Sequence, residues 1–194
     1  MASADDALSR TMAVVARGGR GFVRFRSGSG APPARPTAAA RGWRAAAGSD
    51  ARLILTKQSS RLKHHPGQIA FPGGKVEQSD CAATAAALHE AWEEIGLMPD
   101  NVEVLGQLSQ YETVTNFLIT PVLGRVLGPF VPRPEAGEVF EVPLHHVTNP
   151  AHFIRERRRR RGVWRHYETV PYGPYYIWGA TARIMRGLAD RMAQ

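Results

Sequence analysis

Short runs of apolar and β-branched residues, separated by Gly-, Pro- and polar-rich segments, occupy most of the chain after residue 50. Such runs predict strands, because alternate side chains of a strand face opposite sides of a sheet. Apolar residues spaced three and four apart instead predict helices over residues 81–95 and 181–192, the first ended by Gly96. The predicted strands outnumber the helices and cover residues 51–56, 102–110, 117–126, 138–143, 152–158 and 164–170. This order predicts an α+β fold with a mixed sheet flanked by a few helices.

Residues 1–50 lack this patterning. They are rich in Ala, Gly, Ser, Pro and Arg, and no period of 2 or 3.6 residues is sustained through them. We therefore predict a low-complexity, partly mobile N-terminal region over residues 1–50 and one folded domain over residues 51–194. Within the first region, the spacing of Leu8, Met12 and Val15 predicts a short amphipathic helix around residues 7–16.

The formal net charge of +8 is unevenly distributed. Six arginines surround Glu156 in residues 155–161, whereas the stretch 53–154 is acidic. Clustered arginine is the electrostatic signature of nucleic-acid binding, but this run lacks interleaved aromatic residues. It also lies between two predicted strands, with Gly162 near the turn, so we favour a solvated hairpin end and expect no nucleic-acid partner. Attraction of a small polyanion or of nucleic acid is the alternative.

Other features limit the class of protein. A hydrophobic content of 43% is enough for a core. No apolar run approaches the roughly 20 residues that span a bilayer, and the first ten residues carry Asp5 and Asp6 without the apolar segment of a secretory signal. The single cysteine, Cys81, permits no internal disulfide and no cysteine-based zinc cluster. We therefore expect a cytoplasmic protein without a membrane partner, and a homodimer is left open.

The helix predicted over residues 81–95 carries the strongest chemical signal. Glu90, Glu93 and Glu94 lie near its C-terminal end, where they repel one another and oppose the helix dipole. Either they simply face solvent, or they bind a cation, since carboxylate oxygen is the ligand that Mg²⁺ prefers. A projection at about 100° per residue puts them almost opposite a stripe that we expect to be buried, formed by Cys81, Thr84, Ala85, Leu88, Ala91, Trp92 and Ile95.

A glycine pair stands before this helix. Gly73 and Gly74 in the stretch FPGG allow the backbone to approach a ligand without obstruction from a side chain. The stretch GGKVEQSDCAATAAALHEAWEEIGL resembles the Nudix box, G-x5-E-x7-R-E-U-x-E-E-x-G-U, in which U is a bulky aliphatic residue. Gly74 opens the match, and Gly96 and Leu97 close it. The segment before the H-E pair is one residue longer than the pattern, and His89 stands where the family has arginine.

With this extra residue, the chain resembles the coenzyme A diphosphatase branch of the family, in which the same extension occurs. A second motif of that branch, L-L-T-x-R-S-x3-R-x3-G-x3-F-P-G-G, corresponds here to ILTKQSSRLKHHPGQIAFPGG and includes Gly67. Gln58 and Lys63 replace its two arginines, and Lys57 and Arg61 lie beside those positions, where they could restore charge. The resemblance extends over residues 51–192, with further similarity at 138–144, 149–153 and 176–184.

The resemblance implies an α/β/α sandwich with a mixed sheet and a Mg²⁺- or Mn²⁺-dependent hydrolase of a nucleoside-diphosphate-linked substrate. It implies that Glu90, Glu93 and Glu94 are catalytic and hold the metal, with a further acid from a later loop, Glu138 or Glu135. The metal would neutralise the diphosphate and make water a better nucleophile. The residues implied for substrate binding are Lys57, Arg61, Lys63, Gly67, Gly73 and Gly74.

The second motif favours coenzyme A or an acyl-coenzyme A as the substrate, with 3′,5′-ADP and 4′-phosphopantetheine, or its acyl form, as products. One alternative is another Nudix substrate, such as NADH, ADP-ribose or a nucleoside triphosphate. The other is a weakly catalytic Nudix-fold protein that binds polyanions through residues 155–161.

Overall fold

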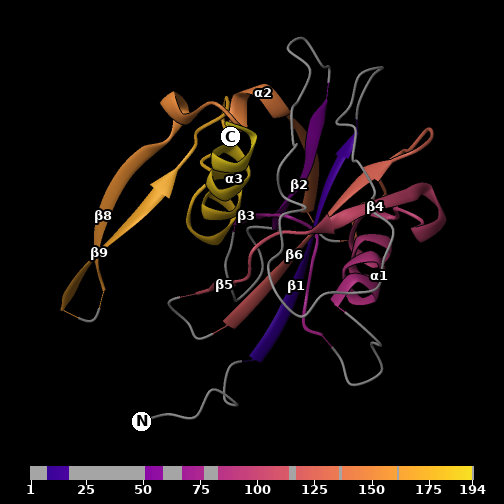
Figure 1. The fold of residues 1–194 in the computed structure, drawn as a ribbon, viewed down its shortest axis with the longest axis horizontal. Helices are drawn as coiled ribbons and strands as arrows, with labels where there is room; N and C mark the ends of the chain where they lie inside the picture. The colour runs from indigo at the N-terminus through magenta and orange to yellow at the C-terminus, as the bar shows by residue number, and fades with distance from the viewer. Residues whose placement is uncertain are drawn as a thin grey trace.

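The computed structural model of the chain describes residues 51–58, 67–76, 83–113, 117–135, 137–159 and 162–193, together with the backbone of residues 8–17 and of residue 160. Its main feature is a seven-stranded mixed sheet, with a separate two-stranded sheet beside it (Figure 1). The main sheet has the order β3-β2-β1-β6-β4, with β7 paired to β2 and β5 paired to β6. Its strands are β1 (Leu8–Arg17), β2 (Arg52–Gln58), β3 (Ile69–Ala70), β4 (Val102–Gln107), β5 (Tyr111–Glu112), β6 (Phe117–Val126) and β7 (Gly137–Pro143).

Helices cover both faces of this sheet, with α1 on one side and α3 on the other (Figure 1). Successive residues of β2 alternate between two cores: Leu53 and Leu55 belong to the core that contains Met185 of α3, and Ile54 belongs to the core that contains Ala91 of α1. The predicted α+β sandwich with a mixed sheet is confirmed. The helices are α1 (Ala83–Ile95), α2 (Leu144–Val147) and α3 (Gly179–Met192), with 3-10 turns η3 (Pro99–Asn101) and η4 (Pro150–His152).

The C-terminal helix matches the prediction from its apolar spacing. Ile184, Met185 and Leu188 of α3 are buried, and Met192 packs against the same core. Within the described ranges, no helix has the length and apolar character needed to cross a bilayer.

Residues 8–17 form a strand, so the short helix predicted around residues 7–16 is wrong. β1 runs parallel to β6, from Leu8 opposite Phe117 to Ala16 opposite Arg125, and its end pairs with β2 in antiparallel fashion. A strand in the middle of a sheet covered on both faces requires a continuous apolar run rather than a stripe with helical spacing. The segment MAVVA supplies such a run. The domain boundary at residue 50 stays a prediction.

The second sheet is the hairpin predicted around Gly162. β8 (Ile154–Arg160) and β9 (Val163–Thr169) pair in antiparallel fashion over their whole lengths, and Gly162 takes the left-handed conformation at the turn, with a φ of 81°. The hydroxyls of Tyr167 and Tyr176 both donate to Glu156 Oε2, at 3.0 and 2.9 Å. The first bond lies within the hairpin, and the second fixes the hairpin to the segment before α3. Figure 1 shows the hairpin projecting beyond α3, away from the main sheet.

Candidate active site

Helix α1 turns a different face toward the sheet from the one predicted. Trp92 is 47% exposed, so its predicted place in the core is wrong. At about 100° per residue, Glu90 and Glu94 lie within the inward-facing arc of the helix rather than opposite it. Small alanine side chains let the helix approach the sheet closely and leave space beside them for these two carboxylates. The buried residues of the helix are Ala86, Ala87, Ala91 and Ile95.

Glu94 is held at the glycine turn that precedes the helix. The backbone N–H of Gly73 donates to its Oε2 at 3.2 Å. Burial raises the pKa of Glu94 to about 7, and the charges of Glu90 and Glu135 raise it as well, against the lowering effect of the Gly73 N–H. Three carboxylates therefore interact electrostatically beside this turn.

Glu90 packs against Gly74. A Cβ atom on Gly74 would lie 1.8 Å from Glu90 Oε1 and 2.7 Å from Oε2, so the carboxylate fills the space that a side chain would need. Close approach therefore explains this glycine. Phe71 is buried in the core and anchors the turn that carries both glycines. The predicted site residues Gly73, Gly74, Glu90 and Glu94 are thus brought together.

Glu93 lies on the outer side of the helix. Its side chain is 50% exposed, and its Oε1 is 3.2 Å from Nε2 of His89, one turn earlier. The His89 ring also lies near the Trp92 ring, with 5.9 Å between centroids. The three glutamates that the sequence groups together are therefore divided between an inner pair and one solvent-facing residue.

A cavity of about 70 Å³ lies beside Glu94 and receives Glu135 from the segment before β7. The Glu135 N–H donates to the Glu94 carbonyl at 3.0 Å, and the Arg133 N–H donates to the Ile95 carbonyl at 2.9 Å. These bonds satisfy carbonyl groups that the end of a helix leaves without partners. They also fix this segment against α1. We name this space the acidic cavity; its walls include Thr56, Gln58, Glu94, Glu135 and Glu138.

Glu138 lines the acidic cavity and has two partners of its own. It faces Lys57 across β2 and β7, and Lys57 Nζ lies 3.9 Å from its Oε2. The Tyr175 hydroxyl donates to Oε1 of Glu138, and the Tyr175 ring stacks on Phe140 with 3.7 Å between centroids. Sequence reasoning missed Tyr175. No local signal identifies it, because 37 residues separate it from Glu138.

The end of β2 belongs to the second motif and lines the acidic cavity. Gln58, which replaces an arginine of that motif, lines the cavity. Its carbonyl accepts a hydrogen bond from the Gly67 N–H at 3.1 Å, and Gly67 has a φ of 68°, which favours glycine. Arg61 and Lys63 lie outside the described residues, so their predicted contact with substrate stays a prediction.

The donor atoms of this region suit a hard divalent cation. Carboxylates dominate the region, and their mutual repulsion contributes to the raised pKa of Glu94. In the part of the chain that the structure describes, no three potential ligands are already grouped around one point. Mg²⁺ usually keeps several water ligands and needs only one or two protein carboxylates. The residues therefore fit such a cation in charge and donor type, without a preformed coordination shell.

Comparison with known proteins defines the class. The family model of the NUDIX domain matches residues 37–165. An uncharacterized Nudix hydrolase NudL of Citrobacter koseri is 42% identical over 144 residues, which cover 71% of this chain and 73% of that protein. The Escherichia coli K12 protein of the same description is 41% identical over 145 residues, with the same coverage. The chain belongs to the Nudix hydrolase family.

Solved structures agree at the level of the fold. A MutT/nudix family protein from Enterococcus faecalis superimposes with a TM-score of 0.51 at 13% sequence identity, covering 100% of this chain and 64% of that one. At this identity the likeness shows the Nudix fold alone.

Proposed function

We propose that this protein is a Mg²⁺- or Mn²⁺-dependent diphosphatase of a nucleoside-diphosphate-linked substrate, with coenzyme A or an acyl-coenzyme A as the substrate. The observation that carries the proposal is the environment of Glu94, a half-buried carboxylate that accepts a hydrogen bond from the Gly73 N–H beside the charges of Glu90 and Glu135. A diphosphate is itself an anion and approaches such a region only together with a cation. When bound, the metal would neutralise the diphosphate and make water a stronger nucleophile.

In this proposal each residue near the glycine turn has a distinct task. Glu90 and Glu94 hold the metal from the inner side of the helix, Glu93 contributes less strongly from its outer side, and Glu138 or Glu135 supplies a further carboxylate. The Gly73 N–H orients Glu94, and the missing side chain of Gly74 leaves room for the Glu90 carboxylate. Partial burial lowers the local dielectric around Glu94 and strengthens its attraction for a cation.

The choice of coenzyme A rests on the second motif and on its place beside the acidic cavity. Gln58 lines that cavity, and Lys57 pairs with Glu138, another of its lining residues. Lys57, Arg61 and Lys63 would meet the phosphates of the substrate, and Gly67 follows them in the same motif. The products would be 3′,5′-ADP and 4′-phosphopantetheine or its acyl form.

The test is an assay of the purified protein with Mg²⁺ or Mn²⁺ and a substrate panel, with products separated by chromatography. The panel contains coenzyme A, acyl-coenzyme A, NADH, ADP-ribose and nucleoside triphosphates. We expect coenzyme A or its acyl form to be cleaved with the highest kcat/KM and no cleavage in EDTA. Glu94→Gln should lower kcat/KM by about 10²- to 10⁴-fold.

The matched control is Glu112→Gln, which removes an exposed carboxylate on β5 and should leave activity unchanged. Full activity of Glu94→Gln, or full activity in EDTA, would refute the metal-dependent role of this region. Faster cleavage of another member of the panel would replace coenzyme A as the substrate and keep the reaction class.

A further inference from the structure

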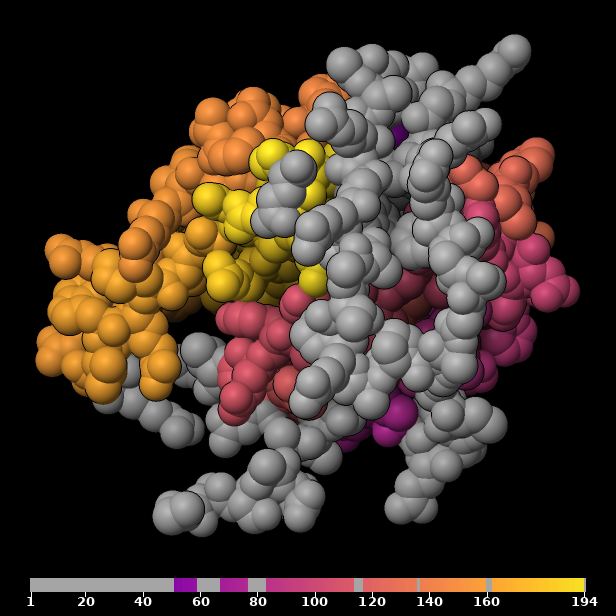
Figure 2. All heavy atoms as spheres, in the orientation of Figure 1, coloured from indigo at the N-terminus to yellow at the C-terminus, as the bar shows by residue number. Residues whose placement is uncertain are grey.

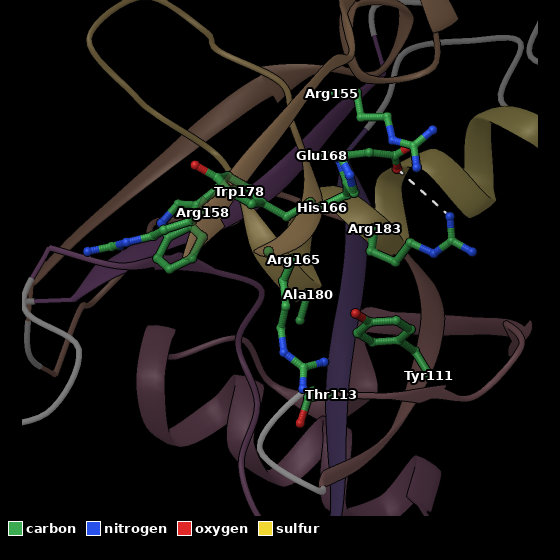
Figure 3. Close-up of a pocket in the computed structure, with 12 residues that line it drawn as sticks. Tyr111, Thr113, Arg155, Arg158, Arg165, His166, Glu168, Trp178, Ala180 and Arg183 are labelled. Carbon is green, nitrogen blue, oxygen red and sulfur yellow. Dashed lines mark ion pairs between the residues drawn. The ribbon is translucent and has the colours of Figure 1, made fainter. Parts of the chain in front are cut away.

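A second cavity lies between the hairpin and the body of the molecule. Its volume is about 500 Å³, and β8, β9, β5 and the beginning of α3 border it (Figure 3). In Figure 2 the orange hairpin adjoins α3, in yellow, and a gap separates it from the pink segment that includes β5. We name this space the hairpin pocket; its size is typical of a site for a small organic ligand. None of its lining residues lines the acidic cavity.

Two arginines from neighbouring strands of the hairpin line this pocket, and their side chains extend in different directions in Figure 3. Arg158 lies directly opposite Arg165 in the register of β8 and β9, so their side chains share one face of the hairpin. Like charges directly opposite each other destabilise a pair of strands. Neither arginine forms an ion pair with any residue that the structure describes. The neighbouring acid on that face, Glu156, already accepts hydrogen bonds from two tyrosines.

Glu168, the one acid among the described residues that line the pocket, does not offset this charge. Nη1 of Arg183 lies 3.9 Å from Oε2 of Glu168, and Nη1 of Arg186 lies 3.8 Å from its Oε1. Glu168 is thus shared between two arginines of α3, which leaves Arg158 and Arg165 as excess positive charge. The first turn of α3 carries no acidic residue and its N-cap makes no side-chain hydrogen bond, so the helix dipole adds to this potential.

The pocket also offers a flat aromatic wall and a hydrogen-bond acceptor. The Trp178 ring is held edge-on by Tyr167, with 5.8 Å between centroids, and Tyr111 lies on the other side of the pocket in Figure 3. Oε2 of Glu168 is buried and accepts no hydrogen bond from the described part of the chain. Its ion pair with Arg183, at 3.9 Å, is too long for a hydrogen bond, so a ligand O–H or N–H group that reaches this oxygen would supply one. An anionic group, a flat ring and a donor group together describe a phosphorylated nucleoside.

We propose that the hairpin pocket binds a phosphorylated nucleoside, with its phosphate between Arg158 and Arg165 and its base against Trp178. The bidentate fork of arginine suits a phosphate group. A pocket bounded by a hairpin, a helix and a strand suits one nucleotide better than a continuous nucleic-acid strand. The site is separate from the acidic cavity and does not depend on the proposed diphosphatase activity. Its ligand is either a free nucleotide or the nucleoside end of a larger substrate.

Calorimetric titration of the full chain with AMP in the presence of EDTA tests the proposal. EDTA removes divalent cations, so the carboxylates of the acidic cavity repel phosphate and do not contribute binding. We expect AMP to bind, with adenosine and inorganic phosphate each at least about tenfold weaker. Arg158→Gln/Arg165→Gln should weaken AMP binding by at least about tenfold, because each arginine makes a charge-assisted hydrogen bond.

The matched control is Arg157→Gln/Arg159→Gln. It removes the same charge from neighbouring positions of β8 that do not line the pocket, and it should weaken AMP binding less than about twofold. Thermal unfolding checks that both double variants keep the fold. We expect no loss of Tm in Arg158→Gln/Arg165→Gln, since the change removes opposed like charges.

Equal weakening in the two double variants would mean general charge attraction and would overturn the proposal. So would the absence of AMP binding to the unmodified protein, or tighter binding of a single-stranded oligonucleotide than of AMP. A further experiment distinguishes a free nucleotide from the nucleoside end of a larger substrate. It measures steady-state kinetics with the substrate that the diphosphatase assay identifies. A raised KM with unchanged kcat in Arg158→Gln/Arg165→Gln assigns the pocket to the nucleoside end of that substrate, and an unchanged KM assigns it to a free nucleotide.

Discussion

The acidic cavity and the hairpin pocket carry charge of opposite sign. The first lies beside α1 and the second beside α3, and these helices lie on opposite faces of the main sheet (Figure 1). The acidic cavity is small, about 70 Å³, and draws its carboxylates from α1 and from the segment around the start of β7. The hairpin pocket is about 500 Å³ and draws its arginines from two neighbouring strands and from α3. Each site places like charges close together, and the two differ in how the repulsion between those charges is relieved.

In the acidic cavity, the chain can relieve repulsion by binding a proton. The raised pKa of Glu94 means that this carboxyl becomes neutral at a pH close to that of the cell. Arginine has no such route, because its guanidinium stays charged throughout the physiological range. The hairpin instead leaves Arg158 and Arg165 exposed, where water screens their charges. Changes of divalent cation should therefore act on the acidic cavity and leave the two arginine charges of the hairpin pocket unchanged.

The largest expected effect is on kcat/KM, and it should distinguish substitution of the inner Glu90 from substitution of the outer Glu93. Glu90→Gln removes a carboxylate that packs against Gly74 and should lower kcat/KM by at least about 10²-fold. Glu93→Gln removes one that is half exposed and paired with His89, and should lower kcat/KM by less than about tenfold. Steady-state kinetics at saturating Mg²⁺, with the substrate identified by the panel, measures both. An equal loss in the two variants would place Glu93 inside the site during catalysis.

The second-largest expected effect is on the pH dependence of the free energy of unfolding of the metal-free protein. Glu94 has a pKa of about 7 in the folded protein against an ordinary value of 4.5, so the folded state binds more protons between these values than the unfolded state does. The free energy of unfolding should therefore fall as the pH rises from about 4.5 to about 7, by about 3 kcal/mol at most from this group. Urea denaturation in EDTA at pH 5 and at pH 8 measures the difference.

Glu94→Gln should remove most of this pH dependence and make the metal-free protein more stable than the unmodified protein at pH 8. Arg158→Gln/Arg165→Gln should retain it, because the hairpin pocket has no part in it. If Glu94→Gln keeps the full slope, the charge of Glu94 is not the source of the pH dependence.

Much of the fold could be predicted from local pattern. The strands at residues 117–126 and 138–143, the hairpin around Gly162 and the apolar face of α3 follow from side-chain periodicity and turn chemistry, and each is present. β1 was mispredicted because its apolar run also fits a helical period over ten residues. Only the backbone partners on both sides, β6 and β2, distinguish the two, and they lie far away in the sequence.

The candidate site was predictable in its chemistry and less so in its geometry. The motif identified Glu90, Glu93 and Glu94, but it could not tell which of them face inward. An alanine-rich helix has only a weak contrast between its apolar and polar faces, so projection from the sequence placed Trp92 in the core and the glutamates opposite it. Tyr175 and the cross-strand pair of Arg158 and Arg165 depend on contacts and register that no local pattern contains.

The smallest expected effect tests this orientation of α1 directly. Trp92→Gln should change the free energy of unfolding by less than about 0.5 kcal/mol, because the side chain is 47% exposed. Ala87→Leu, on the face that packs against the sheet, should cost about 1–3 kcal/mol through overpacking. Urea denaturation in EDTA at constant pH measures both. A larger cost for Trp92→Gln than for Ala87→Leu would mean that α1 is turned the other way. Glu90 and Glu94 would then face solvent and the acidic cavity would lose its carboxylates, while the hairpin pocket would be unchanged.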